Sequence, residues 1–184
     1  MKKLLLIILV TYLCGCHKEK VQPSPEGFEW GFLNWQYSAY VNINGVDILK
    51  YMRAAKDANN SWLGISMNST DADTNYYYPL GISIPHTESG TYSLYNLGTS
   101  NNLSQISYMK TCCYSNPDAI GPTYSVNEAD SLNNYIRIHV DTVTKELSGM
   151  FQATMYVDSF MQNGIDPDTV IMRCDTFYCK YSIQ

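Results

Sequence analysis

Residues 33–45, LNWQYSAYVNING, decide the fold class of this chain. Apolar or aromatic side chains recur at every second position, whereas the positions between them are largely polar; the recurring set is Trp35, Tyr37, Ala39, Val41 and Ile43. Successive side chains of a strand point to opposite faces, so this alternation predicts a strand with one buried face. The pair Asn44-Gly45 follows at once, and Asn-Gly is a strong signal for a two-residue hairpin turn. The stretch therefore predicts a strand that enters a hairpin.

The remainder of the chain continues in the same manner. Further strands are predicted at 61–67, 78–84, 90–97, 103–109, 134–141, 147–157 and 169–183. Only the stretches 50–58 (KYMRAAKDA) and 125–132 (SVNEADSL) have the composition of a helical turn or two. Short strands divided by Gly, Pro, Asn and Asp turns are typical of an all-β sandwich or barrel-like domain. We expect one such domain of about eight strands over residues 28–184.

The N-terminus has the pattern of an export signal. Lys2 and Lys3 precede a ten-residue apolar run, 4–13, which is too short to span a bilayer, since a spanning helix needs about 20 residues. The next residues, LCGC at 13–16, resemble the bacterial lipobox, in which a cysteine is lipidated and becomes the new N-terminus. The resemblance implies that Cys16 carries the lipid and that residues 1–15, with Cys14, are removed. The alternative is an ordinary signal peptide that is cleaved elsewhere.

Residues 16–27 then form a polar, proline-containing tether between the lipidated cysteine and the domain. Several acyl chains would hold the protein durably on a membrane. Removing the two leader lysines lowers the basic count from 12 to 10 against 17 acidic residues, a net charge of about −7. Nucleic acid binding needs Lys and Arg to neutralise phosphates, so this charge argues against a nucleic acid partner.

Four segments together resemble a family of small Bacteroidetes lipoproteins that share a domain of unknown function. They are LGISIPHTESGTYSL, SQISYM, NYIRIHVDTVTKELSGMFQATMY and DTVIMRCDTFYCKY, and the resemblance extends over about residues 34–184. The family closes with a strand that usually has a glycine before its aromatic residue, where this chain has CDTF at 174–177. The resemblance implies a β-sandwich-like fold and a location in the cell envelope, with the outer membrane as the expected address. It implies no activity.

Four cysteines lie in the mature domain, at Cys112, Cys113, Cys174 and Cys179, and the export signal places them in an oxidising compartment. A bridge between neighbours 112 and 113 strains the peptide, and a bridge from 174 to 179 along a straight strand would span about 16 Å, beyond the roughly 4–7 Å that a disulfide permits. Pairing between the two segments is therefore favoured. A zinc site is the alternative, although the spacings C-C and C-x₄-C match no common structural site.

No catalytic or cofactor motif is present: the chain lacks H-E-x-x-H, G-x-S-x-G, G-x-G-x-x-G and a Walker loop. Residues 71–75 (DADTN) begin like a calcium loop, but Tyr76 occupies its glycine position and Ile82 its glutamate position. We therefore expect neither a metal nor a cofactor, and we expect no enzyme. Carboxylates such as Glu88, Glu128 and Asp130 have no spacing that indicates a catalytic pair.

Tyrosine is abundant, with 16 in the chain, and three are consecutive at Tyr76, Tyr77 and Tyr78. Strands favour tyrosine intrinsically, so many of these rings serve structure. Aromatic rings are also enriched at interfaces, which makes Tyr76, Tyr77 and Tyr78 candidate binding residues. Two functions remain open: a non-catalytic binding module for a glycan or a protein partner, and a structural or accessory subunit of an envelope complex.

Three tripeptides resemble the acceptor for O-linked sugars on exported Bacteroidetes proteins, namely Asp, then Ser or Thr, then an aliphatic residue. The candidate acceptors are Ser131, Thr142 and Thr169. The alternative is ordinary turn chemistry, in which Asp and Ser or Thr bond to local backbone. Modification is expected at Ser131 or Thr142 before Thr169, because the first two lie in predicted turns and the third in a predicted strand.

Overall fold

The computed structural model describes residues 35–59, 62–71, 76–85, 87–100, 102–112, 120–130, 132–159 and 166–184. The predicted leader and tether lie outside these residues. Within them the chain forms twelve strands: β1 (Tyr37–Ile43), β2 (Val46–Lys56), β3 (Leu63–Asn68), β4 (Thr70–Asp71), β5 (Tyr76–Tyr77), β6 (Leu80–Ile84), β7 (Gly90–Asn96), β8 (Ser104–Cys112), β9 (Ile120–Val126), β10 (Tyr135–Asp141), β11 (Glu146–Val157) and β12 (Thr169–Ile183). The described part contains no α-helix and no helix long and apolar enough to cross a membrane.

The all-β prediction is confirmed, but the predicted count of about eight strands is too low. Ten strands have five or more residues, and the two additional ones are β2 and β9. Residues 50–56 of the expected helical segment belong to β2, and residues 125 and 126 of the other end β9. The signal of β2 is weak because its buried positions include Lys50 and Lys56 beside Met52 and Ala54, so apolar and polar residues do not alternate.

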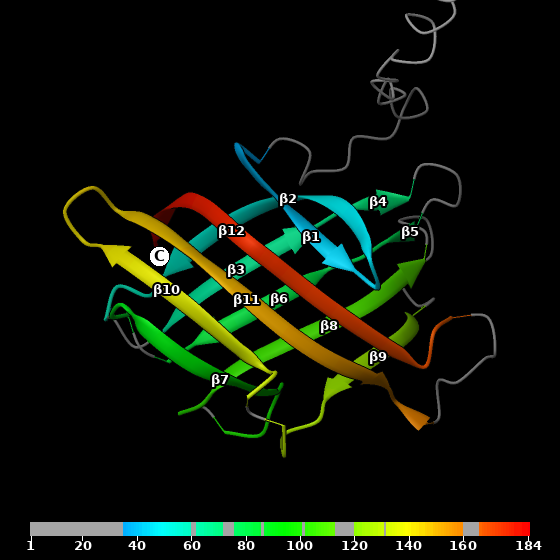
Figure 1. The fold of residues 1–184 in the computed structure, drawn as a ribbon. Helices are drawn as coiled ribbons and strands as arrows, with labels where there is room; N and C mark the ends of the chain where they lie inside the picture. Colours follow the sequence, from blue (N-terminus) through cyan, green and yellow to red (C-terminus); the bar gives the residue numbers. More distant parts are fainter. Residues whose placement is uncertain are drawn as a thin grey trace, which may run out of the picture.

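All strands belong to one sheet that closes on itself. The order of neighbours is β4-β5-β8-β6-β3-β2-β1-β12-β11-β10-β7. β7 also pairs with β8, which closes the path from β8 to β7 into a ring and leaves β4 and β5 outside it. Figure 1 shows β10, β11 and β12 lying across β3, β6 and β8, so opposite walls of the closed sheet face each other as two crossed layers. The architecture is barrel-like, as closure removes the exposed strand edges of an open sheet.

The two hairpins with the clearest sequence signals form as predicted. Asn44 and Gly45 have φ values of 51° and 88°, the positive pair that a type I′ turn requires. All seven residues of β1 pair with β2 beyond this turn. β10 and β11 pair from Asp141↔Glu146 to Tyr135↔Gln152, and the turn between them places Lys145 at φ 57°.

The interior is filled by the inward-facing residues of every wall. β12 shows this most clearly, since buried and exposed positions alternate from Val170 to Ser182 with one interruption, at Asp175 and Thr176, which are both exposed. There the register against β11 shifts, with Phe151 opposite Cys174 and Gly149 opposite Phe177. This is a β-bulge, and it returns Phe177 to the interior after the interruption.

Gly149 lies opposite the bulge and has no room for a side chain. A Cβ built on it would clash with the carbonyl oxygen of Arg137 and would lie 2.8 Å from Cζ of Phe177. The glycine therefore lets the buried Phe177 ring pack directly against the backbone of β11.

Candidate functional site

A recess in the described surface lies where β1 and β12 separate. The two strands pair only at Asn42↔Arg173 and Ile43↔Met172. β12 continues past the rest of β1 without pairing with it. Its next ladder on this side is with β2, at Tyr181–Ile183. Between these two ladders the wall opens into a cleft of about 320 Å³, which we call the β1–β12 groove.

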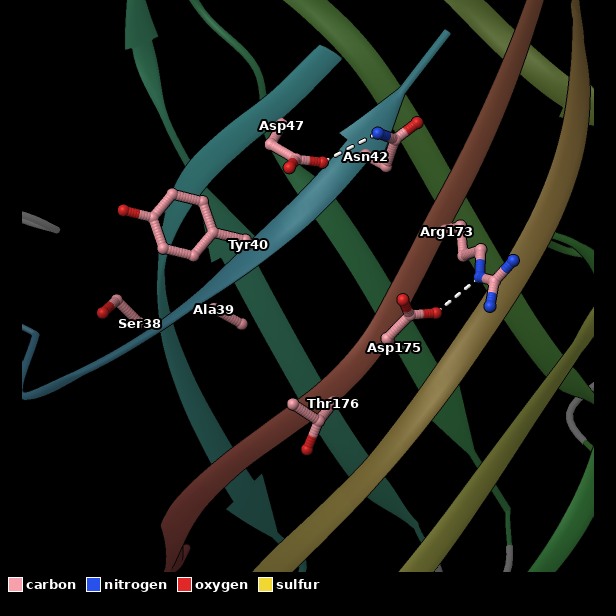
Figure 2. Close-up of a pocket in the computed structure, with 8 residues that line it drawn as sticks. All are labelled: Ser38, Ala39, Tyr40, Asn42, Asp47, Arg173, Asp175 and Thr176. Carbon is pink, nitrogen blue, oxygen red and sulfur yellow. Dashed lines mark hydrogen bonds and ion pairs between the residues drawn. The ribbon is translucent and has the colours of Figure 1, made fainter. Parts of the chain in front are cut away.

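The groove is lined by one aromatic ring and a set of hydrogen-bonding side chains on a small apolar floor. Its lining residues are Ser38, Ala39, Tyr40, Asn42, Asp47, Arg173, Asp175 and Thr176. Figure 2 shows that they come from three strands, β1, β2 and β12. The even-numbered residues of β1 face outward, and the buried Ala39 forms part of the floor.

Two internal contacts hold the charged groups of the groove in place. Asn42 Nδ2 donates to Asp47 Oδ1 at 2.7 Å across the β1–β2 hairpin. Arg173 Nε donates to Asp175 Oδ1 along β12 (Figure 2). Both side chains of this second pair are well exposed, so the pair adds little to stability. Its carboxylate and guanidinium remain accessible to hydroxyl groups of a ligand.

Tyr40 supplies the exposed ring of the groove. It is 65% exposed, more than any other large aromatic side chain in the described part. The wall of the groove opposite Tyr40 is polar because of the bulge in β12. The bulge turns the two consecutive side chains of Asp175 and Thr176 outward. A flat ring beside fixed hydrogen-bond donors and acceptors suits a ligand with an apolar face and many hydroxyl groups, which is the chemistry of a sugar ring.

A second polar group, centred on Lys50, lies inside the closed sheet. Lys50 Nζ donates to Ser69 Oγ at 3.1 Å and to the Tyr78 carbonyl oxygen at 2.9 Å. It also lies 5.5 Å from the ring centroid of Tyr108. Burial of the side chain, which is fully inaccessible, lowers the pKa of Lys50 to about 7.

Two buried tyrosines continue this interior group. Tyr108 packs against Tyr124 with ring centroids 5.5 Å apart, and Tyr124 donates to the Pro167 carbonyl oxygen at 3.2 Å. Burial raises the pKa of both hydroxyl groups, that of Tyr124 to about 12. Since none of these groups reaches the surface, they support the fold and leave the groove as the candidate site.

None of the consecutive tyrosines at 76–78 is among the residues that line the β1–β12 groove. Tyr76 and Tyr77 make up β5, between β4 and β8. Tyr78 is half-buried against the core, and its backbone binds Lys50 and Ser69. Tyr78 is thus only partly exposed, and a binding role for residues 76–78 stays a prediction.

The expected link between the two cysteine segments is not formed. Cys174 and Cys179 are free thiols, both buried. Cys112 ends β8 opposite Tyr76, and no ladder joins β8 to β12, so the segments lie on different walls. Cys113 lies outside the described residues. Among the described residues no group of three or more His, Cys, Asp and Glu side chains could hold a metal ion.

Two of the three glycosylation candidates can be placed. Thr142 is exposed in the β10–β11 turn, where the Asp141 carboxylate accepts from the backbone N–H groups of Val143 and Thr144 at 2.8 and 3.1 Å. These bonds, led by that of Thr144, lower the pKa of Asp141. Thr169 begins β12 and pairs with Tyr156. Ser131 and Cys16 lie outside the described residues.

Two of the three carboxylates considered for catalysis, those of Glu128 and Asp130, bind donors in turns. Glu128 Oε1 accepts from the backbone N–H of Asn96 at 3.0 Å and from Thr99 Oγ1 at 2.8 Å. Asp130 accepts from Asn133 Nδ2 at 3.0 Å. The contact of Glu88 involves its backbone instead, because its main-chain carbonyl oxygen accepts from the Tyr92 hydroxyl at 2.9 Å.

Sequence reasoning missed the groove because its two walls are about 130 residues apart in the chain. The local signals were an outward-facing Tyr40 in an otherwise polar set and the break in alternation at residues 175–176. No protein-family model, curated protein or solved structure matches this chain.

Proposed function

We propose that this protein is a lipid-anchored, non-catalytic binding module of a bacterial cell envelope and that its β1–β12 groove binds a glycan. The expected anchor is the lipid on Cys16, and the expected address is the outer membrane. The observation that carries the proposal is the opening of the wall beyond Asn42↔Arg173, which sets an exposed tyrosine beside fixed polar side chains.

The chemistry of the lining favours a sugar over an apolar ligand. The groove offers carboxylate oxygens on Asp47 and Asp175 as acceptors and the guanidinium of Arg173 as a donor. Sugar hydroxyl groups both donate and accept, so they can satisfy such a set. Tyr40 provides the face against which a pyranose ring can pack.

The same carboxylates support binding better than hydrolysis. Glycosidases use one protonated carboxylic acid in an apolar environment and one carboxylate, on either side of the scissile bond. Here Asp47 is held by Asn42, and Asp175 is a highly exposed partner of Arg173. Neither side chain has the apolar surroundings that a general acid requires.

The alternative, a structural subunit covered by another envelope protein, predicts a continuous apolar surface. Among the described residues the most exposed aliphatic side chains instead lie on separate turns. They are Val143 between β10 and β11, Leu132 between β9 and β10, Leu97 between β7 and β8, and Val46 beside the β1–β2 turn. Scattered exposed apolar residues are normal on a soluble surface. The polar groove therefore favours the glycan.

A glycan array separates the two functions when it is run beside a pull-down from native envelope. We expect the wild-type protein to label a limited set of glycans and the variant Tyr40→Ala to lose most of that signal. The matched control is Tyr156→Ala, since Tyr156 is an exposed tyrosine on β11, outside the groove lining. A silent array together with one stoichiometric protein in the pull-down would overturn the proposal.

A further inference from the structure

A second recess adjoins the β1–β12 groove at the point where β1 begins. Its volume is about 240 Å³, and we call it the junction cavity because β1, β2 and β12 all contribute to it. Its lining residues are Trp35, Gln36, Tyr37, Met52, Arg53, Ala54, Lys180 and Ser182. Met52 and Ala54 are buried and form its floor.

The junction cavity is cationic, unlike the groove. Arg53 and Lys180 are the only charged residues in its lining, and no acidic residue contributes. The groove, by contrast, contains two carboxylates and one guanidinium. The whole chain carries a formal charge of −5, so the protein as a whole does not attract polyanions. Any attraction for an anion is therefore local to this cavity.

The two cations of the junction cavity are differently constrained. The guanidinium of Arg53 stacks over the Trp35 ring, with Cζ 4.7 Å from the ring centroid, which orients its N–H groups in a plane. Lys180 Nζ lies 3.9 Å from Glu146 Oε1, and both side chains are partly exposed. A contact of this length at the surface contributes little, so Lys180 can still bind a ligand anion.

Tyr178 lies on β12 between Thr176 of the groove and Lys180 of the junction cavity. It contacts Tyr37, which lines the junction cavity. Their rings meet edge to face at 6.1 Å, and Tyr178 is 45% exposed on the outer surface. Tyr40 and Trp35 are five residues apart, and a fully extended chain of that length spans at most about 16 Å. This span exceeds one sugar ring, and aromatic side chains recur along it.

We propose that the β1–β12 groove and the junction cavity form one extended site for an acidic polysaccharide. The sugar rings lie along Tyr40 and Tyr178, and a carboxylate or sulfate of the chain is bound by Arg53 and Lys180. Planar guanidinium groups bind such anions with paired hydrogen bonds. This inference rests on the proposed function and deepens it by naming the charge of the glycan.

The test compares two polysaccharides, each with and without its anionic group. Polyglutamate is added as an anionic polymer that contains no sugar. Full-length lipidated protein in detergent micelles is passed over immobilised polygalacturonate, carboxyl-reduced polygalacturonate, dextran, dextran sulfate and polyglutamate. We expect tight binding to polygalacturonate or dextran sulfate, according to whether the anion is a carboxylate or a sulfate. We expect binding that is about tenfold or more weaker to its neutral counterpart and none to polyglutamate.

Variants assign the charge effect to the junction cavity. Arg53→Gln with Lys180→Gln is expected to bind the acidic polymer no better than wild type binds its neutral counterpart. Lys145→Gln, in the exposed β10–β11 turn, is the matched control and is expected to bind as wild type does. Near-ultraviolet circular dichroism identical to wild type shows that the double variant is folded.

The outcomes separate this inference from the function on which it rests. Equal binding of acidic and neutral polymers overturns the acidic specificity and leaves a glycan-binding groove. Binding to polyglutamate as tight as to the acidic glycan overturns the specificity for sugar. An acidic preference that survives in the double variant places the anion elsewhere. If no polysaccharide is bound here and the array is silent, both proposals are wrong.

Discussion

The buried Lys50 makes the stability of this protein depend on pH in an unusual direction. Its pKa falls from 10.5 in the unfolded chain to about 7 in the folded protein because burial penalises the charged form. Between these values the unfolded chain binds a proton that the folded protein does not bind. The contribution of Lys50 to folding stability is therefore smallest below pH 7, and it rises with pH above 7.

The size of the effect follows from the same two values. One pKa unit corresponds to about 1.4 kcal/mol, so the free energy of unfolding should rise by up to about 1.4 kcal/mol per pH unit, and the complete effect is at most about 5 kcal/mol. Above pH 9 two thiols oppose it. Burial raises the pKa of Cys174 to about 11 and that of Cys179 to about 12, so there the unfolded chain loses protons that the folded protein retains. Stability should therefore reach its maximum near pH 9.

Urea unfolding at pH 7.0, 7.5, 8.0 and 8.5, followed by tryptophan fluorescence of a soluble form that begins after Cys16, measures this slope. Lys50→Met should abolish the rise over that range. It should also shift the absolute stability, since Ser69 Oγ and the Tyr78 carbonyl oxygen lose their donor at a cost of about 1–3 kcal/mol. The slope is the diagnostic quantity. Lys180→Met, at an exposed position, should keep it.

The reasoning would be refuted by a wild-type stability that is flat or falls from pH 7 to 8.5. A rise that persists in Lys50→Met would also refute it, because another group would then be responsible. Agreement in slope but not in absolute level would leave the account of the buried amine intact.

Three further predictions follow from other parts of the chain. Cys16→Ser should move the protein from the detergent phase to the aqueous phase in detergent partitioning, whereas Cys14→Ser should not; retention of the first variant in the detergent phase would contradict the lipoprotein prediction. Gly149→Ala should lower the free energy of unfolding by about 2–4 kcal/mol, because its Cβ would clash with the carbonyl oxygen of Arg137, and a loss under 1 kcal/mol in a urea titration would show that the bulge region yields. Intact mass of native protein should show sugar on Thr142 if the source cell has the O-linked pathway, and a mass equal to the lipidated polypeptide alone would remove that idea.

The sequence predicted the elements in which buried and exposed positions alternate over most of their length. The last strand was predicted at 169–183 and is observed as Thr169–Ile183, and the first hairpin turns at Asn44-Gly45 as expected. These elements depend on side-chain periodicity and on turn geometry, and both signals can be read from residues that are adjacent in the sequence.

Where a local rule is broken, the prediction failed. β2 carries two lysines on its buried face, and β9 contains Gly121 and Pro122, which resemble a turn. In both strands pairing with neighbouring strands outweighs the local pattern.

The candidate site could not be predicted, since it depends on the register of β1 against β12. That register is fixed at Asn42↔Arg173, a contact between residues 131 apart. No local pattern states where such a ladder ends. The closed sheet determines how β1 and β12 separate beyond that pair. It therefore also determines that Tyr40 and Asp175 line the same groove.

The central claim is that the β1–β12 groove binds a glycan, and titration calorimetry with a glycan selected by the array tests it most directly. The account predicts that Tyr40→Ala weakens binding about tenfold or more, because the ring loses its packing against the sugar, whereas Tyr156→Ala binds as wild type does. Equal affinities for wild type and Tyr40→Ala, with both proteins folded, would contradict the claim.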